Sequence, residues 1–221
     1  NGLMDNPLVS NENLTLIGSA EHRSVGRQAV RESVVVLKDD NILPLSKDLQ
    51  TLVVAGKGAD NLGMQCGGWS IEWQGGQGDI TVGTTILDGI KKTVSESTEI
   101  IYSEDGSDVV PNSDNIAVVV IGEDPYTEWF GDKESLDLNN DDINLIQSLK
   151  DKGFKVAVLL ISGRPLNVAD HIGQWDAFAA IWLPGTEGDG VSDILFGDFN
   201  SKGRLSFPWP IDAEDGSNAD K

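Results

Sequence analysis

The feature that most constrains the fold is a series of short apolar runs rich in valine, isoleucine and leucine. Four of them lie at Thr51 to Ala55, Ile116 to Ile121, Lys155 to Ile161 and Ala177 to Leu183. Runs of this length and composition are typical of strands that are buried on both faces. The stretches between most of them are long enough to hold helices. The alternation predicts an α/β fold with a mostly parallel sheet.

The remaining elements follow from local patterns. Residues 21 to 31 favour a helix, and the β-branched run Ser33 to Lys38 behind them predicts a further strand. Apolar stripes at helical spacing predict helices that carry Ile86, Leu87, Ile90 and Val94, then Leu145, Ile146 and Leu149 after the start signal Asn140-Asp141-Asp142, and a short third one from Gly190 to Phe196.

The two ends of the chain differ from its middle. Residues 1 to 18 are rich in Asn, Gly and Pro and show no steady period, which is typical of a connecting segment. We therefore predict that residues 1 to 18 form a connecting arm. The end, Asp212 to Lys221, is polar and rich in turn residues, so we expect it to be frayed or cut short.

Charge and composition exclude several classes of partner. With 36 acidic residues against 16 basic ones, the net charge is -20, which repels nucleic-acid phosphates and anionic lipid. No apolar run reaches the ~18 residues of a membrane-spanning helix. Cys66 is the single cysteine, so an internal disulfide is impossible. His22 and His171 lie far apart in no ligand-spaced motif, so we expect no metal site.

An acidic and aromatic octapeptide, Gly122 to Trp129, directly follows the apolar run Ile116 to Ile121. It is therefore expected at the carboxyl end of a strand, where open α/β sheets place their ligand sites. Carboxylates beside aromatic rings suggest sugar chemistry, with Glu123 and Glu128 as the two candidate acids. The residues alone leave both open, since charged loop side chains are most often simply solvated.

A glycine-rich segment, Gly67 to Gly78, is too long for a simple turn between a strand and a helix. Its tryptophans, Trp69 and Trp73, offer flat faces suited to stacking on a pyranose ring, although both could equally be core residues. The segment Gly56 to Asn61 begins like a nucleotide-binding turn. It lacks the third glycine, so a phosphate site is disfavoured.

Several segments together resemble glycoside hydrolase family 3, specifically the second domain of its exo-acting β-glucosidases and β-glucan glucohydrolases. They occur in the family's order and span nearly the whole chain. The matching segments are Arg31 to Lys38 with Ile42 to Leu45, Ala59 to Gly63, Cys66 to Trp69 with Glu72 to Gly75, Gly122 to Glu128, Ser162 to Pro165, Trp182 to Gly188, and Phe196 to Asn200 with Gly203 to Leu205.

The resemblance implies a three-layer α/β/α sandwich with a mostly parallel, flavodoxin-like sheet. It also implies a retaining hydrolase without a cofactor, in which a (β/α)8 barrel supplies an aspartate nucleophile and this domain supplies the general acid/base. On the family's Pro-Tyr-Thr-Glu pattern the acid/base is Glu128. A tryptophan of the glycine-rich loop lines the sugar site; Trp73 matches best and Trp69 second. The implied partners are a β-glucan or gluco-oligosaccharide and the barrel.

The resemblance implies that residues 1–30 are the arm that leaves the barrel and that residues 31–221 are the sandwich domain. The barrel is missing from these 221 residues, so we expect a piece of a longer periplasmic or secreted enzyme that is inactive alone. A branch of the same family, the β-N-acetylglucosaminidases, takes its acid/base from the barrel, and the intact Pro-Tyr-Thr-Glu segment argues against it. The alternative from another class is a non-catalytic, flavodoxin-like module that binds carbohydrate or nucleotide. Arg164 and Glu187 are expected to pair with charges or cap backbone near strand ends.

Overall fold

The computed structural model describes residues 2, 4, 5, 8 and 11–210. Its centre is one six-stranded sheet in the order β1-β6-β5-β4-β2-β3, in which β1 alone runs antiparallel, against β6. The strands in the middle of the sheet are apolar along nearly their whole length and almost completely buried. The strands are β1 (Val35–Asp39), β2 (Thr51–Ala55), β3 (Glu99–Ser103), β4 (Ile116–Gly122), β5 (Lys155–Ile161) and β6 (Ala177–Trp182).

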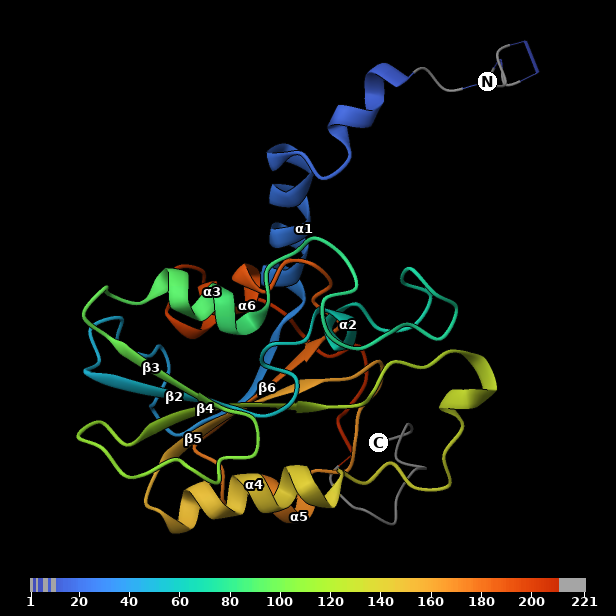
Figure 1. The fold of residues 1–221 in the computed structure, drawn as a ribbon. Helices are drawn as coiled ribbons and strands as arrows, with labels where there is room; N and C mark the ends of the chain where they lie inside the picture. Colours follow the sequence, from blue (N-terminus) through green and yellow to red (C-terminus); the bar gives the residue numbers. More distant parts are fainter. Residues whose placement is uncertain (1, 3, 6–7, 9–10, 211–221) are drawn as a thin grey trace.

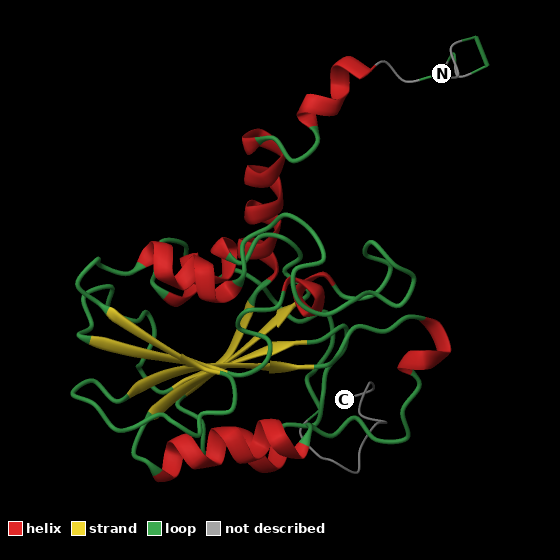
Figure 2. Cartoon of the chain, viewed as in Figure 1, coloured by secondary structure: helices red, strands yellow, loops and turns green. Residues whose placement is uncertain are grey.

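Helices cover both faces of this sheet (Figures 1 and 2). One face carries α1 (Ala20–Ser33), α2 (Leu62–Cys66), α3 (Ile86–Thr93) and α6 (Asp189–Leu195), and the other carries α4 (Asn140–Asp151) and α5 (Ala169–Ile172). Each face has its own apolar core. Alternate strand residues divide between the two cores, so that Val118 and Val120 face one and Val119 and Ile121 the other.

The parallel strands run in the order β3-β2-β4-β5-β6, which in chain order is second, first, third, fourth, fifth. This is the flavodoxin-like arrangement, so the predicted three-layer sandwich is confirmed. The chain reverses its direction of winding between β2 and β4. Open α/β sheets place their ligand sites at such a point, outside the carboxyl ends of the strands. The octapeptide Gly122 to Trp129 follows β4 and lies there.

The predicted strands and the three predicted apolar-stripe helices are confirmed with shifts of a few residues at their ends. One strand was not predicted. Glu99–Ser103 forms β3 at the edge of the sheet, where its residues are mostly half exposed, so its pattern lacks the continuous apolar run of the central strands. The short helices α2 and α5 were also missed. The predictions for residues 212–221 lie outside the described residues.

The segment predicted as an arm contains a 3-10 helix, η1 (Asn11–Leu16), in which every side chain is exposed, and most of α1. Figure 1 shows η1 standing away from the sandwich. The C-terminal half of α1, in contrast, is bound to α6, because Arg27 and Arg31 both donate to the buried carboxylate of Asp193. One continuous helix therefore crosses the predicted boundary at residue 30.

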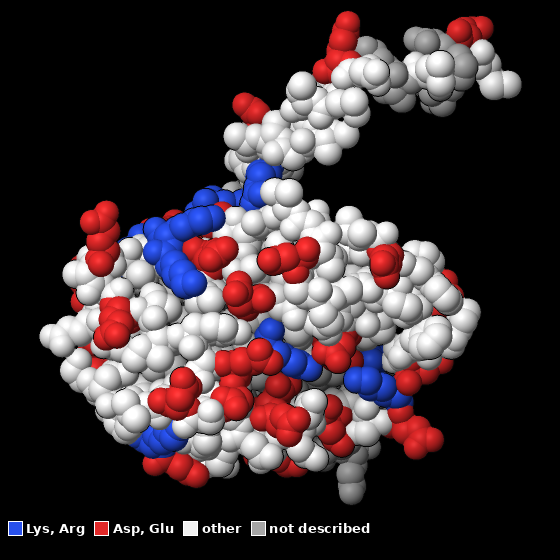
Figure 3. Space-filling model, in the orientation of Figure 1, with Lys and Arg blue, Asp and Glu red and all other residues white. Residues whose placement is uncertain are grey.

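The described residues contain no helix long and apolar enough to cross a membrane. Acidic side chains are spread over the visible surface in Figure 3, in keeping with the net charge of -20. The Lys and Arg side chains on this face gather mainly where the protruding arm joins the body.

Candidate active site

The base of the acidic loop is fixed to the sheet by its backbone. Gly122 ends β4 at φ 155°, and a Cβ there would lie 2.0 Å from the carbonyl oxygen of Ile161 on the neighbouring strand. Only glycine allows this approach. The next backbone N–H, that of Glu123, donates to the same Ile161 carbonyl at 3.0 Å. The loop therefore leaves the sheet in a defined direction.

Glu123 is a buried structural carboxylate. Its side chain is 4% exposed and forms an ion pair with Arg164, at 2.7 Å from Nη2 to Oε1. Lys133 Nζ lies 3.2 Å from the same oxygen, and the hydroxyl of Tyr126 donates to the other at 3.3 Å. Burial, reinforced by the charge of Glu123, raises the pKa of the Tyr126 hydroxyl. The expectation that Arg164 pairs with a charge at a strand end is confirmed.

Glu128 has the opposite environment. It begins the 3-10 turn η2 (Glu128–Gly131) with a left-handed backbone, φ 50°, and its side chain is exposed. Within the described part of the chain its carboxylate has neither a hydrogen bond nor an ion pair. A non-glycine residue in this conformation carries strain, and such strain concentrates at functional sites. Of the two candidate acids, Glu128 is the one available to a ligand.

A group of exposed aromatic rings surrounds the loop tip. The ring of Trp73 lies 5.6 Å from that of Trp129 and 5.9 Å from that of Phe130, and the rings of Trp69 and Trp73 are 6.4 Å apart. We call these four residues the aromatic cluster. The exposed fractions are 68% for Trp69, 44% for Trp73, 62% for Trp129 and 59% for Phe130. Neither tryptophan of the glycine-rich loop is therefore a core residue.

The glycine-rich loop and the acidic loop pack directly on each other. A Cβ at Gly68 would lie 2.1 Å from the carbonyl oxygen of Tyr126, so the two backbones touch. The side-chain oxygen of Gln74 accepts a hydrogen bond from the backbone N–H of Thr127 at 3.1 Å. Figure 1 shows both loops projecting from the same end of the sheet, with η2 as the yellow-green turn. The contact brings Trp73 beside the residues that flank Glu128.

Two hollows border the acidic loop. One, of about 170 Å³, lies between the loops and is lined by Gly68, Glu123, Tyr126, Gly163 and Leu183 among others. The other, of about 270 Å³, lies at the switch point between β2 and β4, where Lys57 forms an ion pair with Asp124 at 3.0 Å. The second hollow is lined at its back by Asp142 of α4. Glu128 lines neither hollow. It lies on the exposed tip of the loop beside the aromatic cluster, whose flat rings are suited to contact with a sugar.

Comparison with known proteins identifies the family of this chain. Residues 34–221 match the model of the glycosyl hydrolase family 3 C-terminal domain. The chain belongs to glycoside hydrolase family 3. It is the sandwich domain of that family, and the resemblance inferred from the motifs is confirmed.

Named relatives of this family 3 domain are hydrolases of β-glycosides. The lysosomal beta glucosidase of Dictyostelium discoideum is 31% identical over 95% of the chain and 28% of its own length. The periplasmic beta-glucosidase of Salmonella typhimurium is 29% identical over 86% of the chain and 28% of its own length. The chain thus spans less than a third of either relative.

Among solved structures, the exo-1,3/1,4-beta-glucanase ExoP of a Pseudoalteromonas species is 40% identical over 90% of the chain and 26% of its own, with a TM-score of 0.81. The beta-glucosidase of Listeria innocua gives 27% identity and a TM-score of 0.77 over 95% of the chain and 30% of its own. The same fold therefore occurs within much longer enzymes of this family.

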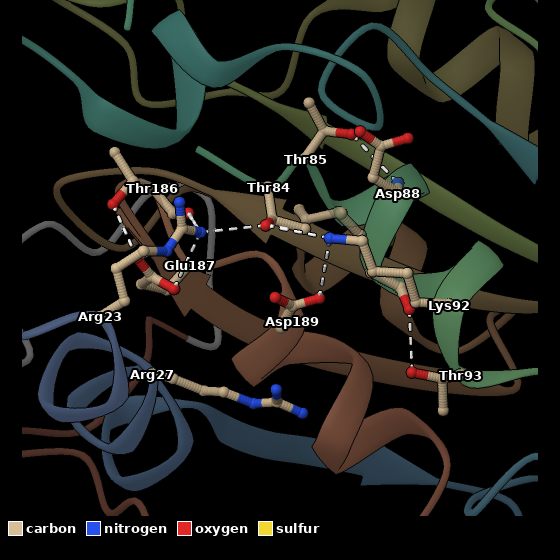
Figure 4. A network of polar contacts seen from close by, with 12 residues as sticks. Arg23, Arg27, Thr84, Thr85, Asp88, Lys92, Thr93, Thr186, Glu187 and Asp189 are labelled. Atoms are coloured by element: carbon tan, nitrogen blue, oxygen red, sulfur yellow. Dashed lines mark hydrogen bonds and ion pairs between the residues drawn. The ribbon is translucent and has the colours of Figure 1, made fainter. Parts of the chain in front are cut away.

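Other motif residues of the family 3 domain lie away from the aromatic cluster. Glu187 is buried in the network of Figure 4, where Arg23 of α1 donates both to its carboxylate and to the hydroxyl of Thr84. Lys92 extends the network toward Asp189. Glu187 thus holds α1 against the sandwich, as expected of a residue that pairs with a charge.

Sequence reasoning did not single out three residues that contact the acidic loop or the aromatic cluster or line the second hollow: Gln74, Phe130 and Asp142. For Asp142 a signal was present, because it lies on the same helix face as Leu145, Ile146 and Leu149 and is buried with them. Burial raises its pKa to about 6, against the pull of Lys57 and a hydrogen bond from the backbone N–H of Gly122. No group of metal-ligating side chains occurs among the residues that the structure describes.

Proposed function

We propose that this chain is the second domain of a retaining, exo-acting β-glucosidase or β-glucan glucohydrolase, and that Glu128 is its general acid/base. The observation that carries the proposal is the position of Glu128, exposed and unpaired within the described residues, at a left-handed backbone position beside the aromatic cluster. The names of the relatives support the reaction class.

In a retaining glycosidase two carboxyl groups lie about 5 to 5.5 Å apart. One attacks the anomeric carbon, while the other protonates the leaving oxygen and later removes a proton from water. Glu123 does not fit either role, because Arg164, Lys133 and Tyr126 occupy its oxygens. The nucleophile in this proposal is an aspartate of the (β/α)8 barrel in the whole enzyme, which also provides much of the sugar pocket.

Trp73 is proposed as one wall of the sugar site, with Trp69 second. The rings of Trp129 and Phe130 both meet that of Trp73 in edge-to-face contact, which favours one orientation of the indole. A fixed, half-exposed indole stacks on a pyranose with little loss of side-chain entropy. The proposed substrate is therefore the non-reducing end of a β-glucan or gluco-oligosaccharide. The name of one relative, the periplasmic beta-glucosidase of Salmonella typhimurium, also supports a periplasmic or secreted location.

The proposal is tested in the full-length enzyme with Glu128→Gln and, as a matched control, Glu134→Gln, which alters another exposed glutamate of the same connection. We expect Glu128→Gln to lower turnover of an alkyl β-glucoside by about 10²-fold or more. A 2,4-dinitrophenyl β-glucoside, whose leaving group needs no proton, should form the glycosyl-enzyme normally, and azide should accelerate its release. Unchanged turnover of the alkyl glucoside by Glu128→Gln would falsify the assignment.

The isolated chain provides a second test. If the active site is shared with a barrel, the chain alone should neither hydrolyse aryl β-glucosides nor bind laminari-oligosaccharides tightly, as measured by calorimetric titration. Tight binding by the isolated chain would favour a self-sufficient carbohydrate-binding module instead.

A further inference from the structure

Arg164 occupies an unusual position relative to the acidic loop. It lies three residues after the last residue of β5, and the loop follows β4. The two strands are parallel neighbours, so their carboxyl ends lie side by side. From there its guanidinium contacts the loop at both ends: Nη2 donates to Glu123 at 2.7 Å and Nη1 donates to the carbonyl of Gly131 at 2.7 Å. One planar group therefore joins the first residues of the loop to the end of η2.

The middle of the loop rests on the same side chain. The guanidinium carbon of Arg164 lies 4.7 Å from the centre of the Tyr126 ring, close enough for a cation–π contact. Gly131 also packs against the Tyr126 ring, because a Cβ at Gly131 would lie only 2.3 Å from a ring atom. Arg164 thus contacts the loop at Glu123, Tyr126 and Gly131, on both sides of Glu128 in the sequence. No hydrogen bond or ion pair joins Arg164 to Glu128 itself.

We propose that Arg164 is a positioning residue that sets the place and direction of the Glu128 carboxylate. This inference rests on the proposed role of Glu128 as general acid/base. Only arginine has a planar fork that can bond a carboxylate along one edge and a carbonyl with its remaining amine. A lysine would keep the ion pair with Glu123 but could not also hold the carbonyl of Gly131 in the same geometry.

The expected signature differs from simple loss of stability. Displacement of a general acid by about 1 Å can cost on the order of 10²-fold in rate, and the loss falls on substrates whose leaving group needs a proton. Arg164→Lys in the full-length enzyme should therefore reduce kcat for an alkyl β-glucoside at least about tenfold more than for a 2,4-dinitrophenyl β-glucoside. KM should change little, because Arg164 does not belong to the aromatic cluster that is proposed to bind the sugar.

The experiment compares Arg164→Lys and Arg164→Met with Lys150→Met as a matched control. Lys150 forms an ion pair with Asp176 at 2.6 Å. Asp176 directly precedes β6, so this ion pair lies at the amino ends of the strands, away from the acidic loop. Its loss should lower the thermal midpoint yet affect both substrates equally. Thermal midpoints of all variants are measured alongside kcat, and Arg164→Lys answers the question even where Arg164→Met fails to fold.

The inference and the proposed function fail in different ways. If Glu128→Gln discriminates between the two substrates but Arg164→Lys affects both equally, or neither, Arg164 does not position the acid and the inference is overturned. If Glu128→Gln itself shows no discrimination, Glu128 is not the acid/base, and both statements fall together. The inference is supported if Glu128→Gln and Arg164→Lys both lower kcat selectively for the alkyl glucoside and Lys150→Met does not.

Discussion

The base and the tip of the acidic loop place two glutamates in opposite environments. At the base, Glu123 is buried and its oxygens are taken by an arginine, a lysine and a tyrosine. At the tip, Glu128 is exposed on a strained backbone and has no partner within the described residues. The difference teaches that the stabilising carboxylate and the candidate catalytic one are separate, and that the first holds the loop on which the second is presented.

The largest expected effect concerns the base of the loop. Glu123→Ala removes one member of a buried ion pair and leaves Arg164 without its partner, so we expect the free energy of unfolding to fall by about 3 to 5 kcal/mol. Urea denaturation of the chain measures the loss. Glu128→Ala, the matched control, should change the same free energy by less than about 0.5 kcal/mol. Equal losses for the two variants would remove the distinction between base and tip.

A third carboxylate, Asp142, is buried beside the base of the loop and lines the same hollow as Gly122 and Glu123. Its pKa is raised from 3.8 to about 6, so the folded chain keeps this proton to a higher pH than the unfolded chain. The contribution of Asp142 to the free energy of unfolding is therefore fully present below pH about 4 and is lost as the pH rises through about 6. A shift of this size corresponds to roughly 2 to 3 kcal/mol.

Asp142→Asn should therefore raise the free energy of unfolding at pH 7.5 by about 2 kcal/mol and flatten its pH dependence between about 4 and 6. The groups facing the carboxylate are Lys57, Asp124 and Asp141, together with the Gly122 N–H. Asp88→Asn, at an exposed position in the first turn of α3, is the control and should change stability by less than about 1 kcal/mol. Urea titrations at several pH values measure both, and an unaltered pH dependence in Asp142→Asn would contradict the expectation.

The smallest expected effect concerns the tip. Glycine adopts a φ near 50° without the strain that a side chain brings, so Glu128→Gly should stabilise the chain by about 0.5 kcal/mol while abolishing general acid catalysis in the full-length enzyme. Glu134→Gly, at an exposed position without a positive φ, should destabilise slightly. Denaturation midpoints distinguish the two. Destabilisation by Glu128→Gly would show that the tip is held by its side chain after all.

Much of the fold could be predicted because its signals are local. Central strands such as Ile116–Gly122 are recognisable by continuous apolar runs, since both of their faces are buried. The edge strand Glu99–Ser103 has no such run, because its burial depends on which neighbours the sheet provides. For the site, the motif drew attention to both glutamates but the residues alone did not separate them.

What the sequence by itself determined was the order of elements, the parallel sheet and the placement of an acidic loop at a strand's carboxyl end. Tertiary structure decided which carboxylate is buried, because Arg164 and Lys133 reach Glu123 only when β4 and β5 lie side by side and the loop folds back. It also brought Trp73 from a distant loop against Trp129. Burial and charge pairing are properties of neighbours in space, and a residue pattern along the chain does not contain them.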